Sequence, residues 1–316
     1  MRVRFPQGAY FINCKIFFQS MPADWKEAFL ARYAQLTDID KFTETSLKPM
    51  RKSIRVNTLK TTVKEIRSRF ELQPIPWCNE GFFIKKQAVG NTMEHFLGYI
   101  YLQGAASMIP PEVLKPKPGD IVLDMCASPG SKTSQMAAMM ENKGMILAND
   151  NKIERLKPLT INLQRCGVLN AVLTRMEGRW FKHQYDKILL DAPCSGIGTI
   201  RKSYKTISMW NPHTIKKMAG VQRQLITTAF NALAENGTMV YSTCTLEPDE
   251  NEAVVNFLLE KYDNAKIEKF SLDIKHGPCV EEFEGETYSS DVKNCLRLWP
   301  QDNDTEGFFV AKIKKV

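Results

Sequence analysis

Hydrophobic and polar positions follow a repeating order through the last two thirds of this 316-residue chain. Short apolar runs of strand length alternate there with longer amphipathic stretches of helical period. Strands are predicted at 121–125, 144–150, 171–176, 185–191, 238–244, 265–271 and 307–315. Helices are predicted at 131–141, 152–165, 213–234 and 251–262. Strands that alternate with helices in this way predict a doubly wound α/β domain.

The first third of the chain has a different pattern. Residues 24–45 predict one amphipathic helix, and strand-like runs at 54–59 and 81–86 flank a helical stretch at 63–70, which indicates a small α+β module. A proline-rich segment precedes the large domain, and residues 276–296 are expected to form a surface excursion. The predicted divisions are a leader at 1–20 outside the fold, a helical and α+β module at 21–115, and the α/β domain at 116–316.

Charge and cysteine content narrow the class of protein. No apolar run is long enough to cross a bilayer. The chain contains no CxxC pair of the kind that binds zinc. A cytoplasmic protein without a metal is therefore expected. Residues 1–118 hold 18 basic against 10 acidic side chains, and residues 143–223 hold 15 against 5. Residues 224–316 are acidic, with 9 against 17. This separation of charge along the chain favours a surface that binds a polyanion over charged surfaces that only face solvent. The stretch 48–69, with eight basic side chains and one acid, strengthens this interpretation.

Two cysteines each follow an apolar run of the kind that ends a buried parallel strand. Cys194 follows LLDAP, Cys244 follows VYST, and an acid-rich segment at 247–250 comes after the second. Open α/β sheets form their sites at the carboxyl ends of strands, and adjacent strands lie about 4.8 Å apart. If the two strands are neighbours, both thiols meet at one place near Asp191. The alternative is that both cysteines are small core residues, the more common use of a free cysteine.

The first strand-to-helix turn of the large domain is the candidate ligand site. It reads LDMCASPGSKT (123–133), which matches neither the GxGxxG fingerprint nor the spacing of a P-loop. Its small residues let a ligand approach the backbone at a helix N-terminus, while Asp124 would repel a phosphate. Asp150 ends the next strand, where an acid commonly binds ribose hydroxyls. These features favour an adenosine ligand without phosphate, such as S-adenosylmethionine, over a purely structural turn with a capping aspartate.

These motifs together resemble the RsmB/NOP (Sun-type) family of RNA cytosine-5 methyltransferases, most of all its archaeal tRNA-modifying members. The resemblance runs from about Ser53 to the C-terminus, and the order of DAPCSG and STC is its most specific part. It implies a Rossmann-like class I methyltransferase sheet with a smaller N-terminal RNA-binding module, S-adenosylmethionine as cofactor, and methylation of cytosine C5 in structured RNA, with tRNA expected. The matching segments are RVNTL (55–59), DMCASPGSKT (124–133), ILAND (146–150), DAPCSGIGTIRK (191–202), VYSTCTLEPDENE (240–252) and GFFVAKIKK (307–315).

The resemblance also implies a role for individual residues. Cys244 matches the family's nucleophile and Cys194 the cysteine that assists product release, a choice that residue chemistry alone leaves open. Lys132 and Asp191 are implied to touch the target base. Cofactor binding is implied for Cys126, Ala127, Ser128, Pro129, Gly130, Ser131, Lys132, Asp150, Arg155, Glu177 and Asp191.

Three positions depart from the family pattern. Ser131 replaces the usual second glycine of the turn, Glu177 replaces an aspartate after the third strand, and Gln301 replaces a frequent histidine. None of the three removes a reacting group. Ser131 is tolerated if its backbone has a negative φ.

RNA is the expected partner, with no membrane, metal or obligate protein partner. The alternatives are an rRNA rather than a tRNA substrate, a DNA methyltransferase, and a catalytically idle RNA-binding assembly protein of the same fold. A basic and aromatic segment, with Tyr204 and Trp210, follows the fourth strand and is expected to approach RNA. The residues predicted to contact RNA are Lys48, Arg51, Lys52, Arg55, Lys60, Arg201 and Lys202.

Overall fold

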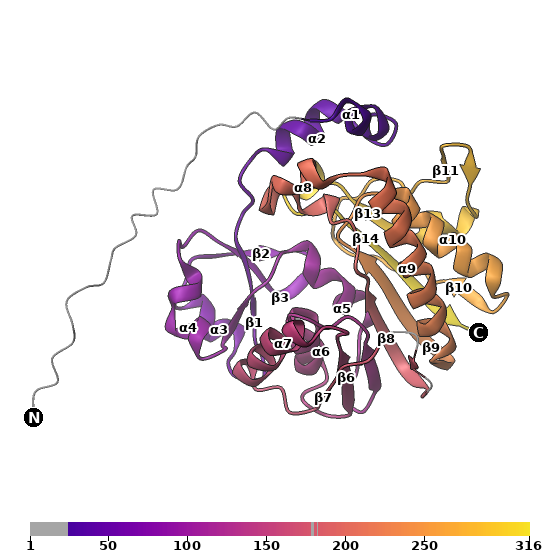
Figure 1. The fold of residues 1–316 in the computed structure, drawn as a ribbon. Helices are drawn as coiled ribbons and strands as arrows, with labels where there is room; N and C mark the ends of the chain where they lie inside the picture. The colour runs from indigo at the N-terminus through magenta and orange to yellow at the C-terminus, as the bar shows by residue number, and fades with distance from the viewer. Residues whose placement is uncertain (1–24, 178–179, 182) are drawn as a thin grey trace, which may run out of the picture.

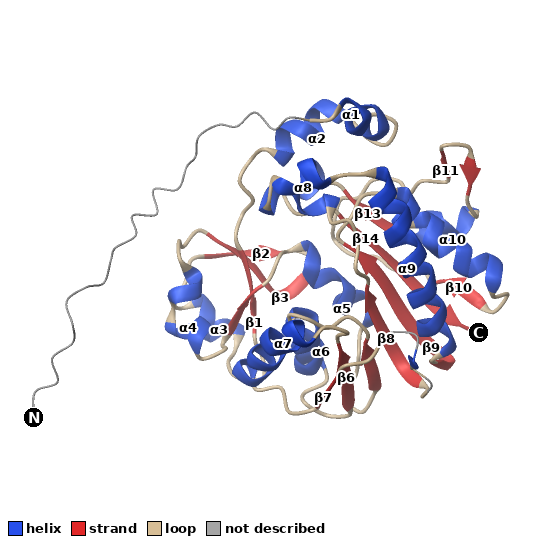
Figure 2. Cartoon of the chain, in the orientation of Figure 1, coloured by secondary structure: helices blue, strands red, loops and turns tan. Residues whose placement is uncertain are grey.

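The large domain is built on one eight-stranded sheet (Figures 1 and 2). The computed structural model describes residues 25–177, 180–181 and 183–316, so the predicted leader lies outside the described residues. The strand order is β10-β14-β9-β8-β5-β6-β7, with β13 also paired to β14. The run β9-β8-β5-β6-β7 is parallel, while β14 is antiparallel to its neighbours. The strands are β5 (Ile121–Asp124), β6 (Met145–Asn149), β7 (Ala171–Thr174), β8 (Tyr185–Asp191), β9 (Leu233–Thr243), β10 (Ala265–Ile267), β13 (Leu296–Leu298) and β14 (Phe308–Lys315).

Helices cover both faces of this sheet, because its central strands are apolar on both sides. Leu189 and Val240 pack with α5 and α6, whereas their strand neighbours Ile188 and Tyr241 pack with α9 and α10. The predicted doubly wound α/β architecture is therefore confirmed. The helices are α5 (Ile109–Leu114), α6 (Ser131–Met139), α7 (Ile153–Cys166), α9 (Pro212–Asn231) and α10 (Glu252–Lys261).

A four-stranded antiparallel sheet in the order β2-β3-β1-β4 forms the smaller module beside α6 and α7 (Figure 1). Two polar side chains of its first strand region tie the module to the large domain. Arg55 donates to Ser134 Oγ at 2.8 Å, and Asn57 donates to the carbonyl oxygen of Cys166 at 2.8 Å. The elements are β1 (Ser53–Val56), α3 (Val63–Arg67), β2 (Leu72–Ile75), β3 (Cys78–Ile84), α4 (Met93–Phe96) and β4 (Ile100–Leu102).

The single helix predicted at 24–45 is two helices, α1 (Glu27–Tyr33) and α2 (Ile39–Ser46). The chain breaks between them because the Asp38 side chain accepts from the Lys41 amide at 3.1 Å and so caps the second helix. Their aromatic side chains pack with two tryptophans of the large domain. This cluster includes Phe29, Tyr33, Phe42, Trp210 and Trp299.

The expected surface excursion at 276–296 is wrong in part. A short hairpin of β11 (Glu282–Phe283) and β12 (Glu286–Thr287) lies there, but Phe283 and Val292 are buried in the core against α9 and α10. Apolar side chains in this segment therefore fasten it to the domain.

Across the described parts of the chain, the structure contains no helix with the length and apolar character to cross a membrane.

Candidate active site

The two cysteines meet where β8 and β9 end side by side. The strands pair in parallel with Asp191 opposite Ser242, so the loops that follow them leave the sheet together. The Sγ atoms of Cys194 and Cys244 lie 3.2 Å apart, although 50 residues separate them in the chain. The expectation that neighbouring strands bring the two thiols to one spot is thus confirmed.

A buried ion pair lies beside the thiols. Lys132, from the first turn of α6, places Nζ 2.6 Å from Asp191 Oδ2 and 3.0 Å from Ser107 Oγ. Ser242 donates to the other carboxylate oxygen of Asp191 at 2.8 Å. The lysine side chain is 10% exposed and the aspartate 27%, so solvent reaches this pair mainly through Asp191.

The two thiols differ in acidity. The pKa of Cys244 is lowered, first by a hydrogen bond with Cys194 and then by the charges of Lys132 and Lys202. Burial and the charge of Asp191 act in the opposite direction but are together weaker. The pKa of Cys194 is raised well above its ordinary value by that same hydrogen bond, by burial and by nearby Glu250. The thiolate is the nucleophilic form of cysteine, and the role of Cys244 as the nucleophile stays a prediction.

A close backbone contact holds the two cysteine loops together. The amide of Gly198 donates to the carbonyl oxygen of Cys244 at 2.9 Å, and Gly198 accepts from the amide of Gly307 at 2.9 Å. A Cβ atom on Gly198 would lie 2.1 Å from the Gly307 oxygen, so only glycine fits. Ser195 and Thr245 add a hydroxyl contact of 2.7 Å between the loops.

A cavity of about 370 Å³ opens next to the thiols at the carboxyl ends of β5, β6 and β8. Seven residues predicted for the site line it, namely Cys126, Ser128, Asp150, Arg155, Asp191, Cys194 and Cys244. The other predicted cofactor residues, Ala127, Pro129, Gly130, Ser131, Lys132 and Glu177, are not in its lining. The sequence analysis missed Met125, Asn149, Asn151, Met176, Ala192, Pro193, Val221 and Leu225.

Asp150 lies on the cavity wall with 3% of its surface exposed. Arg155 approaches it with Nε 3.1 Å from Oδ2 and donates through Nη2 to the carbonyl oxygen of Ser128 at 3.1 Å. This arginine therefore links the first turn to the end of the second strand. Asn149, a signal available in the motif ILAND, shapes the same wall because it donates to the carbonyl oxygens of Met125 and Met176.

The first turn accommodates the substitution of glycine by serine. Gly130 has φ of +99°, and Leu159 would lie 3.0 Å from an added Cβ atom, so the glycine is required there. Ser131 is absent from the residues with positive φ and begins α6. Asp124, by contrast, is buried and is not part of the cavity lining. It accepts from Thr133 at 2.7 Å, and burial raises its pKa to about 7.

Two of the residues predicted to contact RNA are buried, and these predictions are corrected. Arg55 is 1% exposed and bonds to Gln103 and Ser134, while Arg201 is 8% exposed and bonds to the carbonyl oxygens of Pro49 and Thr305. Both guanidinium groups join parts of the protein to each other. Their basic sequence context did not reveal this, because charge density says nothing about burial.

The remaining residues predicted to contact RNA differ in exposure and in whether their charged groups already have partners in the protein. Lys52 is exposed and donates to Gln87, Lys48 forms an exposed pair with Glu44, and Lys202 pairs with Glu306 at 2.6 Å. Lys60 donates to two carbonyl oxygens, and Arg51 pairs with Asp304 and stacks over Phe83. In the basic segment after β8, Tyr204 is 48% exposed, whereas Trp210 is 4% exposed and belongs to the aromatic core.

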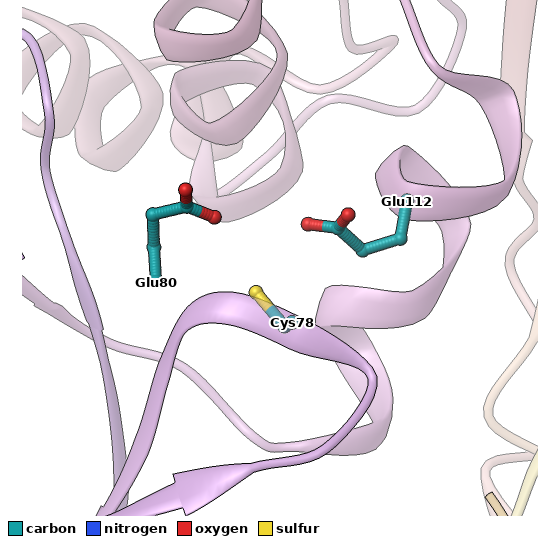
Figure 3. A group of neighbouring side chains, drawn as sticks. All are labelled: Cys78, Glu80 and Glu112. Atoms are coloured by element: carbon teal, nitrogen blue, oxygen red, sulfur yellow. The ribbon is translucent and has the colours of Figure 1, made fainter. Parts of the chain in front are cut away.

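One group of possible metal ligands occurs in the described structure, away from the thiols. Cys78, Glu80 and Glu112 converge where β3 meets α5 (Figure 3). Burial and the two carboxylates raise the pKa of the Cys78 thiol, and Gln135 donates to Glu112 at 2.9 Å. The absence of a metal stays a prediction.

Comparison with known proteins identifies the family. A family described as 16S rRNA methyltransferase RsmB/F matches residues 111–314, and one described as the N-terminal domain of 16S rRNA methyltransferase RsmF matches residues 25–105. The chain is 48% identical to the tRNA (cytosine(49)-C(5))-methyltransferase of Pyrococcus abyssi, over 92% of this chain and 99% of that protein. It is 41% identical to the ribosomal RNA small subunit methyltransferase F of Aliivibrio fischeri, over 92% of this chain but only 64% of that longer protein.

Solved structures agree with this assignment. A crystal structure of a methyltransferase homolog protein from Pyrococcus horikoshii superposes with a TM-score of 0.84 at 37% identity, covering 93% of this chain and 96% of that one. The crystal structure of NSun6 from the same organism with SFG gives a TM-score of 0.82 at 25% identity, covering 92% and 98%. The predicted Rossmann-like methyltransferase fold is confirmed. The chain belongs to the RsmB/F family of RNA cytosine-5 methyltransferases.

Proposed function

We propose that this protein transfers a methyl group from S-adenosylmethionine to C5 of a cytosine in structured RNA through a covalent bond between Cys244 and C6. The observation that carries the proposal is the pair of thiols 3.2 Å apart, beside the ion pair of Lys132 and Asp191 and at the edge of a cavity. Two such thiols suit a reaction in which one sulfur adds to the base and the other assists its release.

The cavity fits the proposed cofactor. Asp150 supplies a carboxylate suited to ribose hydroxyls, and the apolar side chains of Met176, Val221 and Leu225 suit an adenine ring. Cys126 and Ser128 bring the first turn to the same wall. One of the similar structures holds SFG, an analogue of S-adenosylmethionine. When bound, S-adenosylmethionine supplies the electrophilic methyl group, which the ring C5 receives.

The protein side chains make the base reactive. Addition of the Cys244 thiolate to C6 makes C5 enamine-like and therefore nucleophilic. Asp191, which contacts Lys132 and Ser242, is proposed to hydrogen-bond the base edge during the reaction. Afterwards the C5 proton leaves, the double bond between C5 and C6 re-forms, and the bond to Cys244 breaks. Cys194 is the group proposed to assist this release.

The proposed substrate is tRNA. The Pyrococcus abyssi relative, a tRNA enzyme by name, is matched along 99% of its length, whereas the match covers only 64% of the F-type rRNA relative. The target base must leave its stack to reach the thiols, at a cost of a few kcal/mol. Exposed cations on the small module, Lys48 and Lys52 among them, are proposed to hold the RNA backbone.

An adduct-trapping assay tests the proposal. RNA that carries 5-fluorocytosine cannot lose the group at C5, so the wild-type protein should form a complex that survives denaturation. Cys244→Ala should form none, whereas Cys194→Ala should accumulate an adduct on ordinary RNA, because addition proceeds and release is slow. Trapping by Cys244→Ala would reject the assignment of the nucleophile. Bisulfite mapping of tRNA and 16S rRNA after reaction would identify the substrate.

A further inference from the structure

The two thiols of the candidate active site are close enough to react with each other as well as with a base. The Sγ atoms of Cys194 and Cys244 lie 3.2 Å apart, and all seven cysteines in the described part of the chain are free thiols. A disulfide bond is about 2.0 Å long, so the two sulfur atoms must come about 1.2 Å closer to bond. Small rotations of the two side chains can supply a movement of this size.

Hydrogen bonds beside the thiols keep their two loops together. The hydroxyl groups of Ser195 and Thr245, the residues that follow the two cysteines, lie 2.7 Å apart. The Oε2 atom of Glu250 accepts from the Ser195 amide at 2.9 Å, which ties the loop after Cys194 to the segment after Cys244. The loops are therefore held side by side independently of the thiols, and the two sulfur atoms stay near each other.

A small oxidant can reach both thiols. Cys194 and Cys244 are half-buried, and both line the cavity of about 370 Å³. Cys126 is the third cysteine in the lining of this cavity. The lowered pKa of Cys244 adds to its susceptibility, because peroxides react with the thiolate form of cysteine.

We propose that Cys194 and Cys244 form a reversible disulfide bond when a peroxide oxidises the protein, and that this modification closes the active site. The peroxide first converts the Cys244 thiol to a sulfenic acid: its O–O bond breaks, an S–O bond forms, and one water leaves. The Cys194 sulfur then attacks the Cys244 sulfur, the S–S bond forms, the S–O bond breaks, and a second water leaves. The two thiols lose two electrons and two protons, and one peroxide becomes two waters.

The disulfide has two consequences for the protein. Neither sulfur can add to a base while the bond lasts, a consequence that rests on the proposed function, whereas the bond itself does not. The bond also protects Cys244, because thiol reductants reverse a disulfide but do not reverse the sulfinic acid that further oxidation produces. Cys194 would thus preserve the neighbouring thiol in addition to its proposed part in product release.

Peroxide treatment of the full chain, followed by peptide mass spectrometry without reduction, tests the inference. The expected product is a cross-linked peptide that joins Cys194 to Cys244 and is lighter by two hydrogen atoms than the two free peptides together. Iodoacetamide labelling should fall by one Cys194 for each Cys244, and dithiothreitol should restore both. Methyl transfer to RNA should fall in proportion to the cross-link and return on reduction.

Cys126→Ser is the matched control, because it removes the third thiol of the cavity and should leave the cross-link unchanged. In Cys194→Ala, peroxide should carry Cys244 on to the sulfinic acid, which dithiothreitol does not reverse.

Three outcomes in the wild-type protein would overturn the inference. They are loss of Cys244 labelling while Cys194 stays labelled, a cross-link from either thiol to a different cysteine, and peroxide treatment that leaves both thiols labelled. A protein that forms the reversible cross-link but does not methylate RNA when reduced would count against the proposed function instead.

Discussion

The charge of Lys132 is expected to control the ionisation of Cys244. Lys132 lowers the pKa of this thiol, and Asp191, 2.6 Å from the lysine, raises it. Lys132→Met removes the favourable cation and at the same time leaves the aspartate charge uncompensated. Both changes disfavour the thiolate. We therefore expect the pKa of Cys244 to rise in this variant.

The expected size follows from the burial of the pair. Opposite charges within a few ångströms shift a pKa by about 1–3 units, and we take about 1–2 because solvent reaches Asp191. Each unit corresponds to about 1.4 kcal/mol and to a tenfold lower thiolate fraction at a pH below the pKa. Alkylation of Cys244 near neutral pH should therefore slow by about 10–100-fold. At alkaline pH, where the thiol is ionised in both proteins, the two rates should converge.

The assay is the rate of iodoacetamide labelling against pH, with Cys244 and Cys194 resolved by peptide mass spectrometry. It needs neither RNA nor cofactor, so a direct role of Lys132 on the base does not affect it. Asp191→Asn should shift the Cys244 profile toward lower pH, the opposite direction. Lys202→Met should shift it less than Lys132→Met, because Lys202 is 45% exposed and paired with Glu306. An unchanged profile in a folded Lys132→Met protein would refute the reasoning.

Two further predictions concern binding. Asp150→Ala should raise the apparent KM for S-adenosylmethionine by at least about tenfold, or about 1.4 kcal/mol. Turnover at saturation should change little, because ribose hydrogen bonds are similar in the ground and transition states. Steady-state kinetics measure both quantities, and an unchanged KM with a collapsed turnover would contradict this prediction. Replacing the exposed Lys48, Lys52 and Lys85 together by glutamine should weaken RNA binding and reduce the slope of log K against log salt by about two. Filter binding across a salt series measures this, and a wild-type slope would remove this face of the module from the RNA interface.

The amino-acid sequence alone was enough to predict much of the site. Apolar runs of strand length identified β8 and β9, and each cysteine follows one of these runs directly, so the sequence placed both thiols at strand ends. Parallel strands release their chains at the same edge of a sheet, which is why this local information was enough to predict that Cys194 and Cys244 meet. The motif order DAPCSG then STC identified the family for the same reason: both motifs lie within short continuous segments.

The tertiary structure decided what each charged side chain does. Arg55 and Lys52 stand three residues apart in one basic run, yet the first is buried against α6 and the second is exposed. Glu247 and Glu250 likewise stand three residues apart and serve opposite sides of their loop. Val221 of α9 completes a cavity whose polar wall comes from residues about 70 positions earlier. Sequence pattern predicts secondary structure because that depends on neighbours in the chain, whereas burial and ion pairing depend on partners that only the folded packing brings within reach.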